Sequence, residues 1–200
     1  MAISLVKGQK VNLTKESVGL DQVMVGLGWD EAQPEKTGLF SIFSAKPQEI
    51  DCDASAFLLT ENGLERKEDI VYFGNLKHQS KAIKHMGDNL TGAGAGDDEQ
   101  IMIELSKVPK TYNRIIIVVT IYQAQKRGQH FGMIRNAFCR VVDTKTNNEL
   151  CRYNLSDTYE GMTAVVFGEI YRSGNEWKFT ALGNGTQDGS ISQVAARYQK

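Results

Sequence analysis

The sequence predicts an all-β fold: a two-sheet antiparallel β-sandwich with a few short helices and a C-terminal helix. Short runs of apolar, β-branched and aromatic residues recur along the whole chain. Turn-forming residues separate many of these runs, and the connections are too short for the crossovers of a dozen or more residues that parallel strands require. Both observations favour antiparallel neighbours in two packed sheets over a parallel α/β sheet.

About ten segments have the length and composition of strands. Residues 115–122 form the longest apolar run, and this run predicts a buried strand because a membrane helix needs roughly 20 apolar residues. The expected strands are residues 10–14, 22–26, 56–59, 70–73, 101–105, 114–122, 137–142, 149–153, 164–171 and 177–182. Residues 190–199 predict a C-terminal helix, since Ser190 is a good cap and apolar residues follow at helical spacing.

Residues 31–50 do not show the strand-like pattern of the rest of the chain. Pro34, Gly38 and Pro47 surround an apolar patch at residues 39–43, which predicts a long loop inserted in a single domain of residues 1–200. We expect the apolar patch to fold onto its own domain. A contact with a partner or a membrane is the alternative, because exposed apolar side chains lower solubility.

The overall charge gives no reason to expect long-range attraction to nucleic acid or to an acidic membrane. The 23 Lys and Arg residues nearly balance the 24 Asp and Glu residues, so the net charge is -1. Lys77, Lys81 and Lys84, like residues 126–127, are interpreted as solvated surface, with a contact to nucleic acid or acidic lipid as the alternative. The first eight residues lack the pattern of an export signal, so we expect a cytoplasmic location.

The most informative segment is an acidic, glycine-rich loop at residues 87–99. It combines oxygen-bearing side chains with closely spaced glycines, a pattern that burial of apolar surface does not explain. Calcium takes six to eight oxygen ligands, and glycines let a loop bend until carboxylates and backbone carbonyls converge. The side chains that suggest this chemistry are Asp88, Asn89, Asp97, Asp98 and Glu99, around Gly92, Gly94 and Gly96.

The loop has the twelve-residue span of an EF-hand but not its pattern. Leu90 and Gly92 occupy positions where that motif needs oxygen side chains, and residues 100–105 alternate like a strand. Asp30 and Asp53 lie at the ends of two other predicted strands. Loops at one edge of a sandwich lie close together, so these two carboxylates are expected to join the cage.

Two other interpretations of the loop stay open. A phosphate-binding loop would present backbone N–H groups and often Lys, whereas here residues 97–99 would place carboxylates against the anion. A solvated turn with surface acids is the simpler alternative. Ligand type and spacing favour calcium over both.

The sequence contains no recognisable catalytic motif. His78, His85 and His130 are scattered, and His85, near the acidic loop, is expected to pack or hydrogen-bond there. The cysteines lack the spacing of a zinc site and are interpreted as small buried residues. We therefore do not expect an enzyme.

Several motifs together resemble the TerD tellurium-resistance and general-stress family over nearly the whole chain. They include Gly26-Leu-Gly-Trp-Asp30, Phe73-Gly-Asn-Leu76, Gly87-Asp-Asn-Leu-Thr-Gly92, Phe131-Gly-Met-Ile134 and Glu176-Trp-Lys-Phe179. The resemblance implies a bacterial β-sandwich protein that binds calcium at acidic loops and has no established catalytic activity.

The resemblance also implies a ligand set. Its candidate side-chain ligands are Asp30, Asp53, Asp88, Asn89, Asp97, Asp98 and Glu99, with backbone carbonyls from Thr91, Gly92 and Gly96. Ala93 and Ala95 stand where the family usually carries acidic residues, so two potential carboxylates are absent. We therefore expect at least one Ca²⁺ site, with the second in doubt.

The leading hypothesis is a calcium-binding, non-catalytic scaffold or binding module in tellurite, oxyanion or general stress resistance. Its expected partners are proteins, with the inner face of the membrane as a second candidate, and the oligomeric state is left open. The alternative is a metal-dependent enzyme that acts on a phosphorylated metabolite or an oxyanion.

Overall fold

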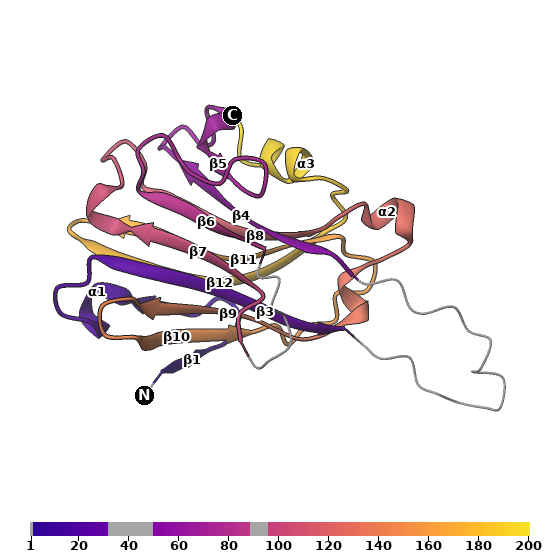
Figure 1. Cartoon of the computed structure of the whole chain (residues 1–200), viewed down its shortest axis with the longest axis horizontal. Coiled ribbons are helices and arrows are strands. Elements are labelled where there is room, and N and C mark those ends of the chain that lie inside the picture. The colour runs from indigo at the N-terminus through magenta and orange to yellow at the C-terminus, as the bar shows by residue number, and fades with distance from the viewer. Residues whose placement is uncertain (1, 32–49, 89–95) are drawn as a thin grey trace.

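The computed structural model describes residues 2–31, 50–88 and 96–200, with Glu31 and Asp88 as backbone only. Two six-stranded sheets are stacked face to face (Figure 1). Sheet A contains, in spatial order, β1 (Ile3–Leu5), β10 (Asn148–Asn154), β9 (Ile134–Asp143), β3 (Gln22–Glu31), β7 (Glu99–Glu104) and β6 (Ile83–Asp88). Sheet B contains β2 (Lys10–Asn12), β12 (Glu176–Thr186), β11 (Ala164–Ser173), β8 (Arg114–Ile121), β4 (Cys52–Leu59) and β5 (Ile70–Val71).

This arrangement confirms the predicted β-sandwich. Among the described strand pairs, only the short pair of β1 with β10 is parallel. Two strands, β1 and β6, were not among those predicted. The apolar–polar alternation of β6 is weak because Lys84, His85 and Gly87 interrupt it.

The helices are short. They are α1 (Leu13–Glu16), α2 (Ala124–Arg127) and α3 (Ile191–Ala196), with 3₁₀ turns at Lys67–Asp69, Leu105–Lys107 and Phe131–Met133. The predicted C-terminal helix is confirmed as α3, whose Ser190 cap accepts a hydrogen bond from the backbone N–H of Gln193. None of the helices in the described residues has the length and apolar character that a membrane crossing needs.

The main core lies between the two sheets and is filled by alternate residues of each strand. In β3, Val23, Val25 and Leu27 are fully buried and point inward. Gly26 and Gly28 alternate with them and therefore face the outer side of sheet A. The predicted loop at residues 31–50, with its apolar patch, lies outside the described residues apart from its two ends.

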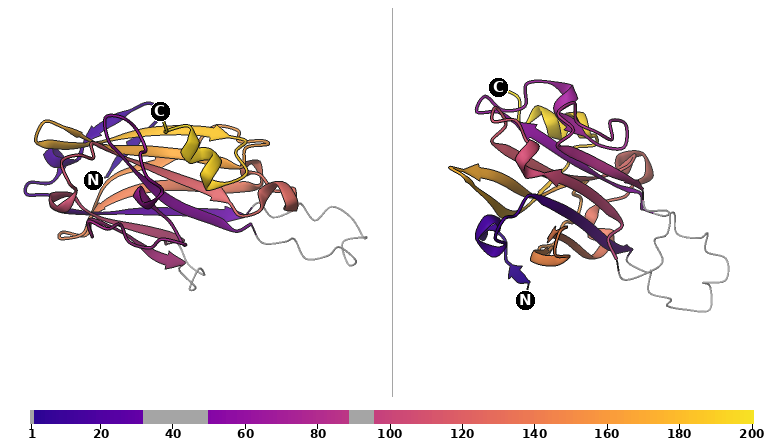
Figure 2. Two further views of the ribbon diagram at one scale, coloured as in Figure 1. Left: turned by 90° about the horizontal axis from the view of Figure 1, so that it is seen from above. Right: turned by 60° about the vertical axis from the view of Figure 1, so that its left-hand side comes forward.

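Sheet B is covered on its outer side as well. A second cluster of buried residues packs α3 against that side, with Val194 and Ala195 of the helix in contact with apolar residues of β4, β8 and β11. The left view in Figure 2 shows α3 lying across the strands. Burial on both sides explains why residues 115–121 are apolar without alternation.

The packing of α3 predicts a stability effect. Val194→Ala removes buried methyl groups and leaves a cavity, so we expect the free energy of unfolding to fall by about 2 kcal/mol. Denaturant titration followed by circular dichroism measures this value. Ser192→Ala changes an exposed residue of the same helix and serves as the control. Equal stability of the two variants would contradict the packing described for α3.

Candidate functional site

The two ends of the acidic loop lie side by side in sheet A. Strands β6 and β7 are antiparallel, and the backbone of Asp88 pairs directly with that of Glu99. The first and last acidic residues predicted from the sequence therefore lie at the base of one connection between two neighbouring strands. The predicted ligands Asn89, Thr91 and Gly92, and also Ala93 and Ala95, lie outside the described residues.

Glu99 places a carboxylate between the two sheets. Its Oε2 accepts a hydrogen bond from the backbone N–H of Ala54 in β4, so the side chain of a sheet A residue contacts the backbone of sheet B. The residue is only 4% exposed. Among the described residues, no Lys or Arg forms an ion pair with it. A buried carboxylate without a cation is costly, so this position suits a positive ion.

His85 of β6 orients Glu99. Its Nδ1 accepts a hydrogen bond from the backbone N–H of Gly87 at 3.0 Å, and its Nε2 lies 3.3 Å from Glu99 Oε2. An imidazole that accepts at Nδ1 carries its proton on Nε2, and that proton is donated to the carboxylate. The expectation that His85 hydrogen-bonds beside the acidic loop is confirmed.

Further carboxylates surround the start of β4. Burial raises the pKa of the Cys52 thiol well above its ordinary value, and the negative charges of Asp53, Asp51, Glu99 and Asp98 raise it further. These acids come from separate parts of the sequence. Asp53 alternates in β4 with Cys52 and Ala54, which face the core, so its side chain points to the outer side of sheet B, away from Glu99. That Asp53 joins one cage with residues 98–99 stays a prediction.

Asp98 and Asp30 lie at the end of β3. The N–H of Asp98 donates to the carbonyl of Leu27 at 2.7 Å, and its Oδ2 accepts from the N–H of Trp29 at 2.7 Å. Asp30 is exposed, and its Oδ2 accepts a hydrogen bond from Asn136 Nδ2 at 2.7 Å. Gly96 is exposed beside them. The hydrogen bonds of Asp98 fix the end of the acidic loop against β3.

Asp97 lies on the other side of sheet A, away from Glu99. Gln100 of β7 and Arg140 of β9 both pair with Gly26, one on each side of β3. Since Gly26 has no side chain, the Asp97 carboxylate lies directly over it. Arg140 donates from Nε and Nη2 at 2.7 and 2.9 Å, and Gln100 Nε2 donates at 3.1 Å. Asp97 is therefore a buried carboxylate that already has its cation.

The same face carries a second arginine. Arg152 of β10 is the cross-strand neighbour of Arg140, a like-charge pairing that would be unfavourable alone. Glu149 accepts hydrogen bonds from both guanidinium groups at 2.9 to 3.2 Å. Arg152 also stacks on the ring of Phe138 at 4.2 Å, and that ring lies over Gly28.

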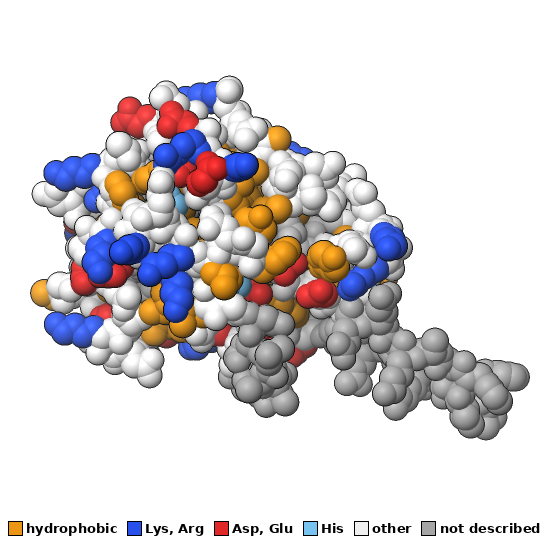
Figure 3. Space-filling view, turned by 45° about the horizontal axis from the view of Figure 1, so that its top comes forward, with side chains coloured by type: hydrophobic (Ala, Val, Ile, Leu, Met, Phe, Trp, Pro, Cys, Tyr) orange, Lys and Arg blue, Asp and Glu red, His pale blue; other side chains and the backbone are white. Residues whose placement is uncertain are grey.

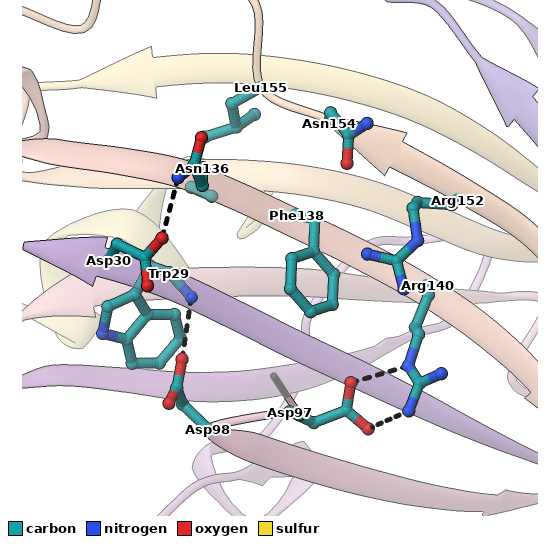
Figure 4. A pocket seen from close by; sticks show the side chains of 12 residues that line it. Trp29, Asp30, Asp97, Asp98, Asn136, Phe138, Arg140, Arg152, Asn154 and Leu155 are labelled. Carbon is teal, nitrogen blue, oxygen red and sulfur yellow. Dashed lines mark hydrogen bonds and ion pairs between the residues drawn. The ribbon is translucent and has the colours of Figure 1, made fainter. Parts of the chain in front are cut away.

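These residues border a pocket of about 890 Å³ on the outer side of sheet A (Figure 4). Trp29, Asp30 and Asn136 lie on one side, and Arg140, Arg152 and Asn154 lie on the other. Asp97 points towards Arg140, whereas Asp98 points towards the backbone of Trp29. The pocket is thus lined by acids at one end and by arginines at the other.

The fold therefore divides the acidic run predicted from the sequence. Glu99 points between the sheets, and Asp97 lies on the outer face with Arg140. Across residues 2–31, 50–88 and 96–200, no three His, Cys, Asp or Glu side chains form a group that could hold a metal ion. A complete set of ligands needs oxygen atoms from the remainder of the loop.

The sequence did not identify Arg140 or Glu149 as parts of this region. Both lie at least 40 residues from the acidic loop, and only strand register places Arg140 beside Gly26. The available signal was the glycine pair at positions 26 and 28, because alternate glycines inside a strand mark the close approach of another group.

Comparison with known proteins decides the family. Residues 1–198 match the model of the TerD domain. The chain belongs to the TerD family. This is a stress-response and tellurium-resistance protein family, and the resemblance seen in the sequence motifs is confirmed.

Similar proteins cover the chain from end to end. The stress response protein SCP2 of Bacillus subtilis (strain 168) is 50% identical over 199 residues, which are 99% of this chain and 100% of that protein. The tellurium resistance protein TerD of Serratia marcescens is 42% identical over 199 residues, 99% of this chain and 97% of that protein.

Solved structures share the fold. A crystal structure of a protein of unknown function aligns with a TM-score of 0.66 at 21% identity, covering 91% of this chain and 99% of that one. The crystal structure of a telluride resistance protein (TerD) homologue from Streptomyces coelicolor A3(2) aligns with a TM-score of 0.62 at 22% identity, covering 88% and 96%.

The pairing of Asp97 predicts a strong effect of Arg140→Met. This variant leaves the fully buried Asp97 carboxylate without its cation, and we expect the free energy of unfolding to fall by about 3 kcal/mol. Chemical denaturation measures the loss. Asp97→Asn in the same chain should recover part of it, since the two residues are coupled. Additive effects of the two substitutions would contradict the pairing.

The three cysteines predict slow thiol chemistry. All are buried, and burial together with the nearby Glu149 charge raises the pKa of Cys151 to about 12. At pH 8 its thiolate fraction is on the order of one in ten thousand. We expect labelling by a disulfide reagent to be over 100-fold slower in the native protein than in denaturant. Rapid labelling of the native protein would show an accessible thiol.

Proposed function

We propose that this TerD-family protein is a calcium-binding, non-catalytic module that acts as a scaffold or binding protein in stress resistance. The observation that carries the proposal is the environment of Glu99. Its buried carboxylate has no described Lys or Arg as a partner, and like Asp51, Asp53 and Asp98 it raises the pKa of the Cys52 thiol. A divalent cation would compensate these charges and join the loops that carry them.

The donor set suits calcium better than a softer metal. Carboxylate and carbonyl oxygens are hard ligands, and no Cys thiol in the described residues is exposed to bind zinc. Glu99, Asp98 and Asp53 are described candidates whose charges all reach the Cys52 thiol, and Asp30 adds a carboxylate at the end of β3. Asp88, Asn89 and the carbonyls of residues 91, 92 and 96 would complete it.

Asp97 is the weakest candidate ligand. Both of its carboxylate oxygens accept hydrogen bonds from Arg140, so a metal ion would have to share or replace a guanidinium. We propose that Asp97 instead anchors the end of the acidic loop to the outer side of sheet A, while Asp98 and Glu99 face the ion. With Ala93 and Ala95 in the loop, one bound ion is expected.

The remaining polar groups support a non-catalytic role. His78 and His85 are buried, and each is hydrogen-bonded to a carboxylate, Asp69 and Glu99 respectively. A general base must reach its substrate. A cysteine that reduces an oxyanion must be exposed and deprotonated. The three cysteines are buried, so the proposal gives them no such role. The proposal therefore assigns stress resistance to binding, in the cytoplasm and with protein partners.

Calorimetry on chelator-stripped protein tests the proposal. We expect calcium to release or absorb heat, to raise the melting temperature and to outcompete magnesium, because the loop supplies many oxygen ligands. At 100 times Kd, the stabilisation should be about 2.7 kcal/mol. The stoichiometry gives the number of ions.

Matched variants locate the ion. Glu99→Gln keeps an acceptor for the Ala54 N–H but removes the charge, and it should weaken calcium binding strongly. Glu104→Gln removes a charge at the far end of the same strand and should bind like the parent protein. No heat and no stabilisation by calcium would reject the proposed function. Turnover of a phosphorylated substrate that requires the metal would favour an enzyme instead.

A further inference from the structure

The β6 edge of sheet A carries a group of exposed apolar and basic side chains. The segment before β6 folds back along it: the N–H of His85 donates to the carbonyl of Leu76, and Lys77 pairs with Lys84. We call this surface the edge patch. It consists of Phe73, Leu76, Lys77, Lys81, Lys84 and Met86.

The apolar members are exposed to solvent. Phe73 is 56% exposed, Leu76 46% and Met86 48%. Phe73 lies at the tip of a tight turn in which Tyr72 and Asn75 exchange backbone hydrogen bonds. Figure 3 views this side of the molecule and shows hydrophobic side chains at the surface with Lys and Arg side chains beside them. Such exposure is characteristic of a surface that is covered by a partner.

The basic members have no acidic counterparts. In the described residues, neither Lys77, Lys81 nor Lys84 forms an ion pair, whereas Lys107 and Arg114 each pair with a glutamate. Cross-strand neighbours point to the same side, so Lys77 and Lys84 present their ammonium groups together. Met86 lies two residues beyond Lys84 and shares its side of the strand. Leu76 lies opposite His85 and therefore on the other side of these paired segments, so exposed apolar side chains flank the lysines on both sides of the edge.

This combination fits a lipid surface better than a protein surface. Lysine is depleted from protein–protein interfaces, where Arg and aromatic residues replace it. Lysines that flank exposed Leu, Phe and Met side chains are typical of surfaces that insert apolar groups between lipid headgroups while the ammonium groups contact phosphate. The charge of the patch is complementary to an anionic membrane.

We propose that the edge patch docks this protein on an anionic membrane surface. Lys77, Lys81 and Lys84 bind the lipid phosphates, and Phe73, Leu76 and Met86 enter the headgroup layer. The docking does not depend on calcium, because the patch supplies its own positive charge. Membrane docking therefore goes beyond the proposed function, and it can be tested independently of calcium binding.

Vesicle sedimentation in the presence of a chelator tests the proposal, since calcium that bridges carboxylates to lipid is then excluded. We expect the protein to sediment with phosphatidylglycerol/phosphatidylcholine vesicles and to stay in solution with pure phosphatidylcholine. Added salt should weaken the binding because it screens the phosphates. Each lysine contributes about fivefold to the partition coefficient, so Lys77→Gln/Lys84→Gln should lower it roughly 25-fold.

A matched double variant separates the patch from overall charge. Lys10→Gln/Lys145→Gln removes the same charge from exposed positions elsewhere and should bind like the parent protein. Leu76→Ser/Met86→Ser keeps every lysine and should lower the partition coefficient by roughly tenfold or more. Equal binding of the two lysine variants would overturn the proposal. So would binding to immobilised polyglutamate without binding to anionic vesicles, which would indicate an acidic protein as the partner.

Discussion

Glu99 connects the fold of this protein to its candidate site. The side chain lies between the sheets, where the backbone N–H of Ala54 and the imidazole of His85 are its described donors. Neither donor carries a full positive charge in the tautomer that the hydrogen bonds define. The end of the sandwich is therefore held together by a carboxylate whose charge is only partly compensated, and closing the two sheets there depends on how that charge is satisfied.

Asp97, two residues earlier in the chain, differs from Glu99 because it pairs with an arginine. Its carboxylate is equally buried, but Arg140 compensates it completely on the outer side of sheet A. Adjacent acids in a loop commonly suggest one shared function. In this protein they have different neighbours: Asp97 precedes β7 and lies over Gly26 on the outer side of sheet A, whereas Glu99, the first residue of β7, contacts Ala54 of sheet B.

Much of the fold followed from local patterns. The alternation in β7 and the turn residues between β11 and β12 predicted strands in nearly their observed places, and burial of both faces of β8 agrees with its unbroken apolar run. The short β1 was missed because three residues carry too little periodic signal, and its position depends on pairing with β10 near the other end of the chain.

The candidate site was predictable only in part. The acidic loop between two neighbouring strands followed from composition and from the location of strand ends. The partnership of Asp97 with Arg140 depends on the register of β3 against β9, which no local pattern encodes. The glycines of β3 were visible as a motif, but their role as the surface under Asp97 and Phe138 required the three-dimensional arrangement.

The two sheets differ in how much freedom they leave to the sequence. Sheet B has α3 on its outer side and the core on its inner side, so nearly every residue of β8 is constrained by packing. Within the described part of the chain, the outer side of sheet A has a pocket instead of a covering helix, and its side chains contact one another or solvent. Apart from coupled groups such as Asp97 and Arg140, substitutions on that side therefore cost less stability than substitutions in β8, and recognition can diverge there more readily.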